Sequence, residues 1–453
     1  MLRPLTTRLA RRGLVVFAAA FVLLEIIESY LRPTTADGVH FQAWSSETLM
    51  QSVSVRELRE APLETLWNLH VQPPLHSAIR AVFAGLHGDR PWGDLVNDVD
   101  RDLYHVWALA SAALAALVFA WLRKLGLPRA LAAMLSLIWF LHPANLGYAT
   151  LLDSTLLSAL MTVWIIYEVW RLSHEPRGSL VPLGCAVLLA YFTRSLYQWP
   201  FVAVILGSLA LLKVPRRNLV AFGAVLVTVV GLYSLKQALL FGTVATSTLR
   251  GTNLVNGIGA KCEVAAPGQP APRPPSSASV LLLPQKTDGS SNLNHLARLD
   301  AERELLACFR RNLAERPLAS LWTAWKSNFE IYIRPSSAYF PNPIVDRAAW
   351  RRPFDDVFSR DNLLWISFVA ALLTAARMRR RPRAALAVLL PVAYVFAVSV
   401  TAEHGENMRF KFFLEPALFV WWAASAYLAA RYLHRMWRLA REVPPTLSAA
   451  RGG

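Results

Sequence analysis

The stretch ADGVHFQAWSSETLMQSVSVRELREAPLETLWNLHVQPPL, residues 36–75, follows the first apolar run of the chain. It combines the acids Asp37 and Glu47 with His70 and the turn Gln72-Pro73-Pro74. Adjacent prolines restrict the backbone and favour the first turn of a helix. Most of the remaining chain consists of apolar runs that are typical of membrane helices. We therefore expect these helices to hold the polar stretch against one face of a bilayer.

The composition indicates a polytopic membrane protein. The chain has 453 residues, of which 55% are hydrophobic, and its mean hydropathy is +0.34. Its formal charge is +17, from 47 Lys and Arg against 30 Asp and Glu. The basic residues cluster at the ends of apolar runs, as topology-setting residues do. We expect no nucleic-acid partner, because no basic stripe interleaved with aromatic residues lies outside those flanks.

The N-terminal apolar run, residues 14–30, predicts an uncleaved first membrane helix. Four arginines precede it, as they would in a signal peptide, but Glu25 and Glu28 stand where small cleavage-site residues would be needed. A basic N-terminus stays in the cytoplasm, so residues 36–102 are expected outside.

The hydropathy pattern predicts about ten membrane helices in an all-α bundle. The expected helices cover residues 14–30, 103–122, 130–147, 151–170, 180–193, 199–212, 219–240, 363–376, 384–401 and 412–430. Every second connection is rich in arginine, which places both termini in the cytoplasm.

Three regions follow from this arrangement. Residues 1–240 form an N-terminal module with seven helices and the first outer loop (36–102). Residues 241–362 form a second large extracytoplasmic region, and residues 363–453 form a three-helix module with a basic cytoplasmic tail. Cys262 and Cys308 both fall in the outer region, either as a disulfide or as two unrelated thiols.

Acidic residues at the outer ends of apolar runs are candidates for catalysis, because ionisable groups at membrane depth are costly unless paired or functional. Glu47 is the first candidate for a base that takes a proton from an acceptor hydroxyl, with Asp37 as a substitute. Alternatively, Glu47 is a carboxylate at a helix N-terminus, beside serines that are good caps. Asp153 is either the N-cap of the fourth helix or a second active-site carboxylate.

Cations on the outer side run against the positive-inside bias, so topology does not explain them. Arg194, Arg409 and Lys411 are of this kind. A guanidinium binds phosphate through two hydrogen bonds, which suits a lipid-phosphate leaving group. The alternative is pairing with acids nearby in the sequence: Glu403, Glu406 and Glu415.

Further polar residues flank these groups. His70 is a candidate for phosphate or metal binding, or else an interfacial histidine. We expect Gln72, Glu406 and Asn407 to contact substrate. The sequence contains no Cys/His cluster at zinc spacing and no convincing ligand set, so a divalent cation stays an open expectation.

Four short motifs resemble the GT-C superfamily of polyprenyl-phosphate-dependent glycosyltransferases. They are SSETLMQ (45–51), HVQPPLH (70–76), LLDSTLL (151–157) and GENMRFKFFLEP (405–416). That superfamily includes protein O-mannosyltransferases, lipid A aminoarabinose transferases and cell-wall arabinosyltransferases. Its members usually carry Asp, often Asp-Glu, at the first position, where this chain has Glu47 after Ser46. Either Glu47 replaces the aspartate, or Asp37 is its counterpart.

The resemblance implies a GT-C-like bundle with two large extracytoplasmic loops, in a bacterial inner membrane. It implies an inverting transfer of a sugar from a polyprenyl phosphate to a hydroxyl of a lipid, glycan or protein. A carboxylate would deprotonate the acceptor, and Arg409, Arg194 or both would stabilise the leaving phosphate. Two other functions stay open: a transporter or flippase of lipid-linked sugars, and an inactive relative that binds glycolipids.

Overall fold

The protein is described by a computed structural model that covers residues 13–26, 45–49, 51–260, 262, 279–339, 351–356, 369, 381–401 and 405–442. Asp37, Glu403 and all but Val369 of the expected helix 363–376 lie outside these residues. The described part is helical, and its strand-like pairing is a single bridge between Gln285 and Ser291.

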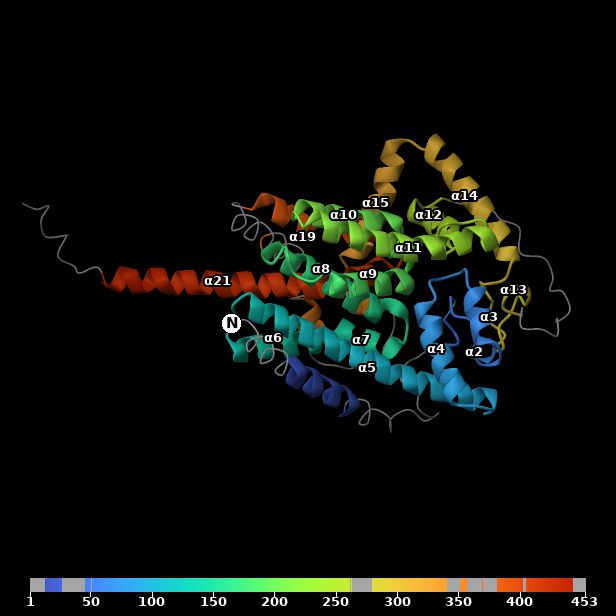
Figure 1. Ribbon diagram of the computed structural model, residues 1–453, viewed down its shortest axis with the longest axis horizontal. Helices are drawn as coiled ribbons and strands as arrows, with labels where there is room; N and C mark the ends of the chain where they lie inside the picture. The colour runs from blue at the N-terminus through green and yellow to red at the C-terminus, as the bar shows by residue number, and fades with distance from the viewer. Residues whose placement is uncertain are drawn as a thin grey trace, which may run out of the picture.

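The long helices run in nearly the same direction and form a bundle (Figure 1). Four described helices are long and apolar enough to cross a membrane: α5 (Trp92–Lys124), α8 (Ser154–His174), α11 (Arg216–Phe241) and α19 (Pro382–Thr401). A fifth span results if α6 (Arg129–Phe140) and α7 (Pro143–Leu151) are counted together. The multi-pass character is thus supported, whereas the expected count of ten spans stays a prediction.

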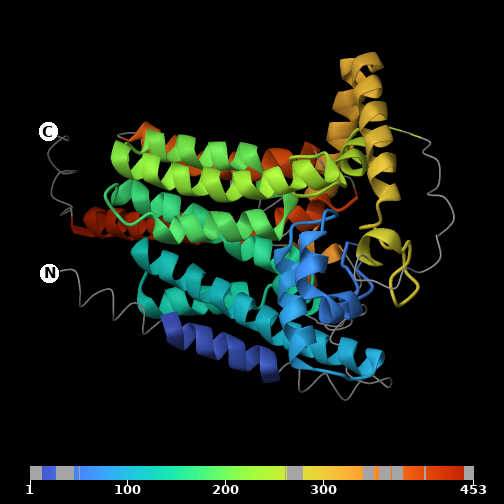
Figure 2. The ribbon, with the colours of Figure 1, turned by 45° about the vertical axis from the view of Figure 1, so that its right-hand side comes forward.

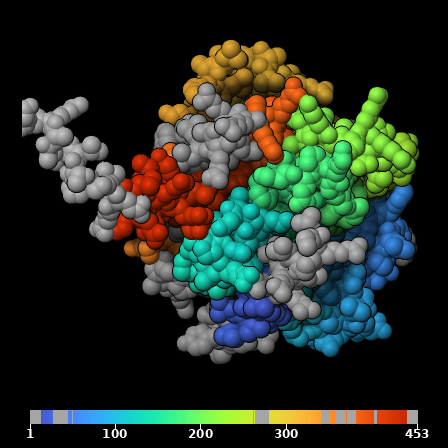
Figure 3. Space-filling view, turned by 60° about the vertical axis from the view of Figure 1, so that its left-hand side comes forward, coloured from blue at the N-terminus to red at the C-terminus, as the bar shows by residue number. Residues whose placement is uncertain are grey.

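Shorter or more polar helices complete the bundle. They are Gly13–Ile26, α9 (Val181–Thr193), α10 (Trp199–Leu211) and α21 (Glu415–Glu442). The N-terminal helix packs along α5 (Figures 2 and 3), where the Tyr104 hydroxyl donates to the Leu24 carbonyl at 3.0 Å. The last helix extends twelve residues beyond its expected end at 430.

The prediction of one continuous helix over residues 130–147 is wrong. The chain forms two helices there, α6 and α7, with a bend of 55° between them. Pro143 cannot donate a backbone hydrogen bond, and the His142 side chain caps α7 by accepting from the Ala144 amide at 3.1 Å. The side-chain Nδ2 of Asn145 donates to the Phe140 carbonyl at 2.9 Å, which satisfies a backbone group at the break. Local side chains therefore stabilise the bend.

The remaining elements gather mainly at one end of the bundle (Figure 2). The first loop contains α2 (Val55–Glu60), α3 (Pro62–Trp67) and α4 (Leu75–Leu86). The second region contains α12 (Arg250–Gly257), α13 (Ser279–Leu282), α14 (Ala297–Glu315), α15 (Leu318–Tyr332), η3 (Ser336–Ala338) and α17 (Arg351–Phe354). Two short elements, η2 (Ser195–Tyr197) and α20 (Asn407–Lys411), connect bundle helices.

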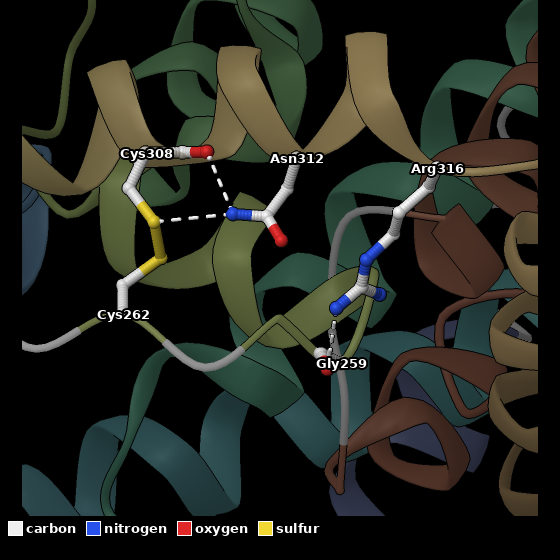
Figure 4. The surroundings of a disulfide bond; sticks show 5 residues. All are labelled: Gly259, Cys262, Cys308, Asn312 and Arg316. Atoms are coloured by element: carbon white, nitrogen blue, oxygen red, sulfur yellow. Dashed lines mark hydrogen bonds between the residues drawn. A yellow bond between two sulfur atoms is a disulfide. The ribbon is translucent and has the colours of Figure 1, made fainter.

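A disulfide joins Cys262 to Cys308, which decides between the two alternatives for these cysteines (Figure 4). Their Cα atoms are 6.3 Å apart. One turn further along α14, Asn312 donates to the Cys308 carbonyl at 3.0 Å, and Arg316 donates to the Ile258 carbonyl at 2.5 Å. The second half of α14 is therefore fastened to the segment that follows α12.

Candidate functional site

A buried arginine, Arg409, lies at the centre of the candidate site. Its Nη2 is 3.4 Å from Asp153 Oδ2, and its Nη1 is 3.1 Å from Glu406 Oε2. Nη1 also donates to the Tyr339 hydroxyl at 2.7 Å, and that hydroxyl donates to Glu406 Oε1 at 2.7 Å. Burial raises the pKa of Tyr339 to about 12, so the phenol keeps its proton. Two carboxylates and a phenol thus hold one guanidinium in place.

Asp153 has two local roles at once. Its carboxylate caps α8 by accepting from the Thr155 amide at 2.9 Å and from the Thr155 hydroxyl at 2.7 Å. Trp107 Nε1 donates to the Asp153 carbonyl at 2.8 Å, which fixes the backbone of the cap. The N-cap interpretation is confirmed, and the same carboxylate faces Arg409 from a helix N-terminus.

A second arginine reaches the same helix start. Arg194 follows α9, and its Nη1 donates to the Ser154 hydroxyl at 3.1 Å. Its guanidinium carbon lies 4.5 Å from the centre of the Phe410 ring, and that of Arg409 lies 5.9 Å from the same ring. Two planar cations beside the N-terminus of α8 form a suitable arrangement for binding phosphate.

Lys411 does not fit the expected phosphate contact. Its Nζ donates to the carbonyls of Ile333 and Arg334 at 3.2 and 2.6 Å, and lies 3.6 Å from Glu415 Oε1. Glu415 Oε2 in turn accepts from the Ser336 hydroxyl at 2.6 Å. The alternative of pairing with nearby acids therefore describes Lys411 better, and its position indicates a structural role.

Glu47 forms a separate buried ion pair with Arg80 of α4. Glu47 Oε2 lies 2.7 Å from Arg80 Nη2, and the two side chains are 2% and 0% exposed. The same oxygen accepts from the Val55 amide at 2.9 Å, at the start of α2. Glu47 itself lies in a turn and not at the N-terminus of its own helix, and Ser54 caps α2, so the alternative with Ser45 and Ser46 as caps is wrong. Glu47 Oε1 is buried and has no hydrogen-bond partner among the described residues.

Further donors fix the turn that carries Glu47. Arg80 also donates to the Ser46 hydroxyl at 3.0 Å and to the Val53 carbonyl at 2.5 Å. Lys286, from the second outer region, donates to the carbonyls of Glu47 and Leu49. Arg80 and Lys286 are not among the site residues expected from the sequence. The signal for Arg80 was present, since it is the one charged residue in the amphipathic segment 75–86.

His76 lies between the Glu47–Arg80 pair and the start of α8. It lies one helical turn before Arg80 on α4, on the same face of the helix. Its Nε2 is 2.8 Å from the Leu152 carbonyl, so Nε2 carries the proton that this acceptor requires. Burial, and next the charge of Arg80, lower the pKa of His76 to about 4. A neutral imidazole therefore separates the Glu47 pair from the residue that precedes Asp153.

His70 has protein partners on both ring nitrogens, which does not fit phosphate or metal binding. Its Nδ1 is 2.9 Å from the Thr248 hydroxyl, and its Nε2 is 2.9 Å from the Asn294 carbonyl. The Asn294 side-chain oxygen also accepts from the amides of His70 and Val71, at 2.8 and 3.1 Å. His70 therefore positions the backbone before the double proline.

The three expected substrate contacts differ in accessibility. Glu406 is 38% exposed beside Arg409, whereas Asn407 is buried and donates to the Ser399 carbonyl at 2.8 Å. Gln72 is half-buried, with Nε2 3.4 Å from the Ser77 hydroxyl. Glu406 is thus the best placed of the three to meet a ligand.

The described residues contain no group of three or more His, Cys, Asp or Glu side chains placed to hold a metal ion. No protein-family model matches the chain, and neither a curated protein nor a solved structure is significantly similar to it.

Proposed function

We propose that this chain is a membrane glycosyltransferase of the polyprenyl-phosphate-dependent kind. It would move a sugar to a hydroxyl of a lipid, glycan or protein acceptor on the extracytoplasmic face of a bacterial inner membrane. The observation that carries the proposal is a pair of buried carboxylate–arginine contacts, Glu47–Arg80 and Asp153–Arg409. Helix α4 lies next to both of them, because Arg80 pairs with Glu47 and His76, one turn earlier, contacts the Leu152 carbonyl beside Asp153. Ionisable groups buried in this way at a membrane surface favour a functional site.

In this proposal, Arg409 and Arg194 bind the phosphate of the donor, and Asp153 with Glu406 keeps Arg409 oriented. Glu47 Oε1 is the base. Among the carboxylate oxygens of Glu47, Asp153 and Glu406, it is the one that has no hydrogen-bond partner in the described structure. Leaving such an oxygen buried without a partner costs about 1–3 kcal/mol, which an acceptor hydroxyl would recover by donating to it.

The reaction would proceed with inversion. The acceptor oxygen attacks the anomeric carbon while the bond from that carbon to the phosphate oxygen breaks. The electron pair leaves with the phosphate, where the two guanidinium groups stabilise the added charge. The acceptor proton passes to Glu47. The disulfide between Cys262 and Cys308 supports the extracytoplasmic side, since disulfides persist in oxidising compartments.

A transporter of lipid-linked sugars is the second candidate, and the break between α6 and α7 favours it. Transporter sites often use interrupted helices whose freed backbone groups face a ligand. Here, however, the side-chain amide nitrogen of Asn145 donates to the Phe140 carbonyl and also to the Ser111 hydroxyl, at 2.9 and 2.8 Å. The Phe140 carbonyl at the break is therefore paired within the protein, and the transferase remains our first proposal.

The purified full chain in phospholipid vesicles tests both candidates. The vesicles receive polyprenyl-phosphate hexoses and pentoses together with lipid, glycan or peptide acceptors, and mass spectrometry follows each lipid. Transfer of the sugar with release of polyprenyl phosphate supports the transferase. Movement of an intact donor to the other leaflet supports the transporter and overturns our proposal, as does a lack of any change across the panel.

Asp153→Asn is the sharpest variant, because asparagine keeps the cap of α8 while removing the charge that faces Arg409. We expect turnover to fall about 100-fold, as for the loss of one electrostatic contact in a site. Asp98→Asn is the matched control. Asp98 is also buried and paired with arginines, Arg90 and, at 3.2 Å, Arg101, but it lies outside the site. Equal losses in both variants would contradict the assignment of Asp153.

A further inference from the structure

Helices α14 and α15 form a hairpin that extends sideways from the bundle (Figures 1 and 2). Its turn and the first part of α15 expose large apolar side chains outside any candidate span: Leu313 is 45% exposed, Leu318 84% and Trp322 61%. Each Å² of apolar surface left in water costs about 25 cal/mol, so a cluster of such residues indicates a partner.

The apolar residues of α15 lie on one face. Trp322, Trp325 and Phe329 follow Leu318 at helical spacing, and their rings stack with centroids 4.9 and 5.5 Å apart. Most polar residues lie on the other side of the helix, including Lys326 and Glu330, whose charged atoms are 3.9 Å apart. The helix is therefore amphipathic, with an aromatic row of the type found at membrane interfaces.

The root of the hairpin fixes its position relative to the membrane. Phe329 and Tyr332 contact Phe396 of α19, with ring centroids 6.4 and 5.3 Å apart. Since α19 is a candidate span, α15 is attached to a membrane-facing helix, and it runs across the direction of the bundle (Figure 2). Asn328 fastens it further by donating to the Gly257 carbonyl at 2.8 Å. An amphipathic helix held in this way lies in the plane of the membrane surface.

We propose that the α14–α15 hairpin is a membrane-interface element whose partner is the phospholipid bilayer itself. Leu318 and Trp322 insert below the headgroups, while Ser320 and the Lys326–Glu330 pair face water. The disulfide and the Asn328 contact keep the hairpin at this angle when the chain is taken out of the membrane. This inference depends on the membrane character of the bundle and not on the proposed transfer reaction.

Site-directed spin labels in vesicles of phosphatidylcholine and phosphatidylglycerol test the proposal. Leu318→Cys and Ser320→Cys are made separately in a Cys185→Ala chain, which retains the disulfide. The two positions are two residues apart, so their side chains point to nearly opposite sides of α15. We expect the label at 318 to be relaxed by oxygen and shielded from a water-soluble nickel complex. The label at 320 should show the opposite preference.

Purified chain in defined vesicles contains no other protein, so protection at 318 assigns the surface to lipid. Equal exposure of both labels to the nickel complex would overturn the proposal, because the hairpin would then stand clear of the bilayer. Equal shielding of both labels from the nickel complex would also overturn the proposal, because a helix at the membrane interface exposes one of its sides to water. A labelled Thr323→Cys chain confirms the water-facing side, and retention of the disulfide reports that each variant is folded.

Discussion

The buried contact between Glu47 and Arg80 affects how a substitution of Glu47 has to be interpreted. The carboxylate faces a guanidinium that is itself excluded from solvent. Removing one partner of such a pair leaves an uncompensated buried charge, whereas replacing both by neutral groups avoids that cost. A loss of activity after substitution of Glu47 alone would therefore mix an effect on folding with an effect on catalysis.

Glu47→Gln should lower the free energy of unfolding by about 3–5 kcal/mol, because Arg80 then stays buried without its partner. The double variant Glu47→Gln with Arg80→Met should recover much of that loss, since no isolated charge remains. Thermal unfolding of the purified chains in detergent measures both effects. A single variant as stable as the native chain would contradict the buried pair.

The stability of the protein should fall as pH is lowered from about 6.5 to 4. Burial lowers the pKa of both His70 and His76 to about 4, from an ordinary 6.5. In this window the unfolded chain binds protons that the folded chain does not, so stability is complete above pH 6.5 and is lost toward pH 4. The loss is on the order of 3 kcal/mol for each histidine.

His76→Gln tests this expectation, because glutamine keeps a donor for the Leu152 carbonyl and does not titrate. His76 faces the charges of Arg80 and Asp153, and His70 faces Lys236 and His295. The variant should show about half of the pH dependence in its unfolding temperature. An unchanged slope between pH 6.5 and 4 would show that His76 does not contribute.

At the scale of elements, contacts distant in the chain hold the outer region. Residues 284–294 reach back to the first loop, where Lys286 donates to the Glu47 carbonyl and Asn294 binds the His70 backbone. The disulfide then fastens α14 to the segment after α12. Described parts of the two expected outer loops, 36–102 and 241–362, therefore pack against each other, although the loops are far apart in sequence.

Loss of the disulfide should loosen this unit locally. The cysteines are 46 residues apart, and closing a loop of that length restricts the unfolded chain by about 4 kcal/mol. Cys262→Ser should therefore increase hydrogen exchange in α12 and α14, while α5 and α8 keep their protection. Cys185→Ala, at the free cysteine of α9, is the control and should change neither region. Equal exchange in the native and Cys262→Ser chains would argue against the contribution of the bridge.

At the scale of the whole molecule, the distribution of charge orients the bundle. Arg216 and Arg217 begin α11, and Arg431, Arg435 and Arg438 lie exposed along the end of α21. The disulfide and the candidate site lie toward the opposite end of the long helices. If the bundle crosses a membrane, the positive-inside rule predicts that the arginine-rich end lies in the cytoplasm.

This orientation predicts opposite labelling at two exposed positions. In a Cys185→Ala chain, Thr323→Cys on α15 should react with a membrane-impermeant maleimide. The cells are treated so that the reagent reaches the outer face of the inner membrane while that membrane stays closed. Asn218→Cys at the start of α11 should react only after the membrane is opened. Reversed labelling would invert the proposed sidedness and remove the extracytoplasmic reaction with it.

Hydropathy and capping are local, so the sequence by itself predicted apolar helices of the membrane type, most helix positions and, as one of two alternatives, the cap at Asp153. It also selected Arg409, Arg194, Glu47 and Asp153 as candidates, because charge at the end of an apolar run is visible in one dimension. Only the tertiary structure decided that Glu47 meets Arg80, that Asp153 meets Arg409, and that His70 is already satisfied by Thr248 and Asn294. The partner of a buried charge is chosen by the packing of segments tens to hundreds of residues apart, and no local pattern encodes that choice.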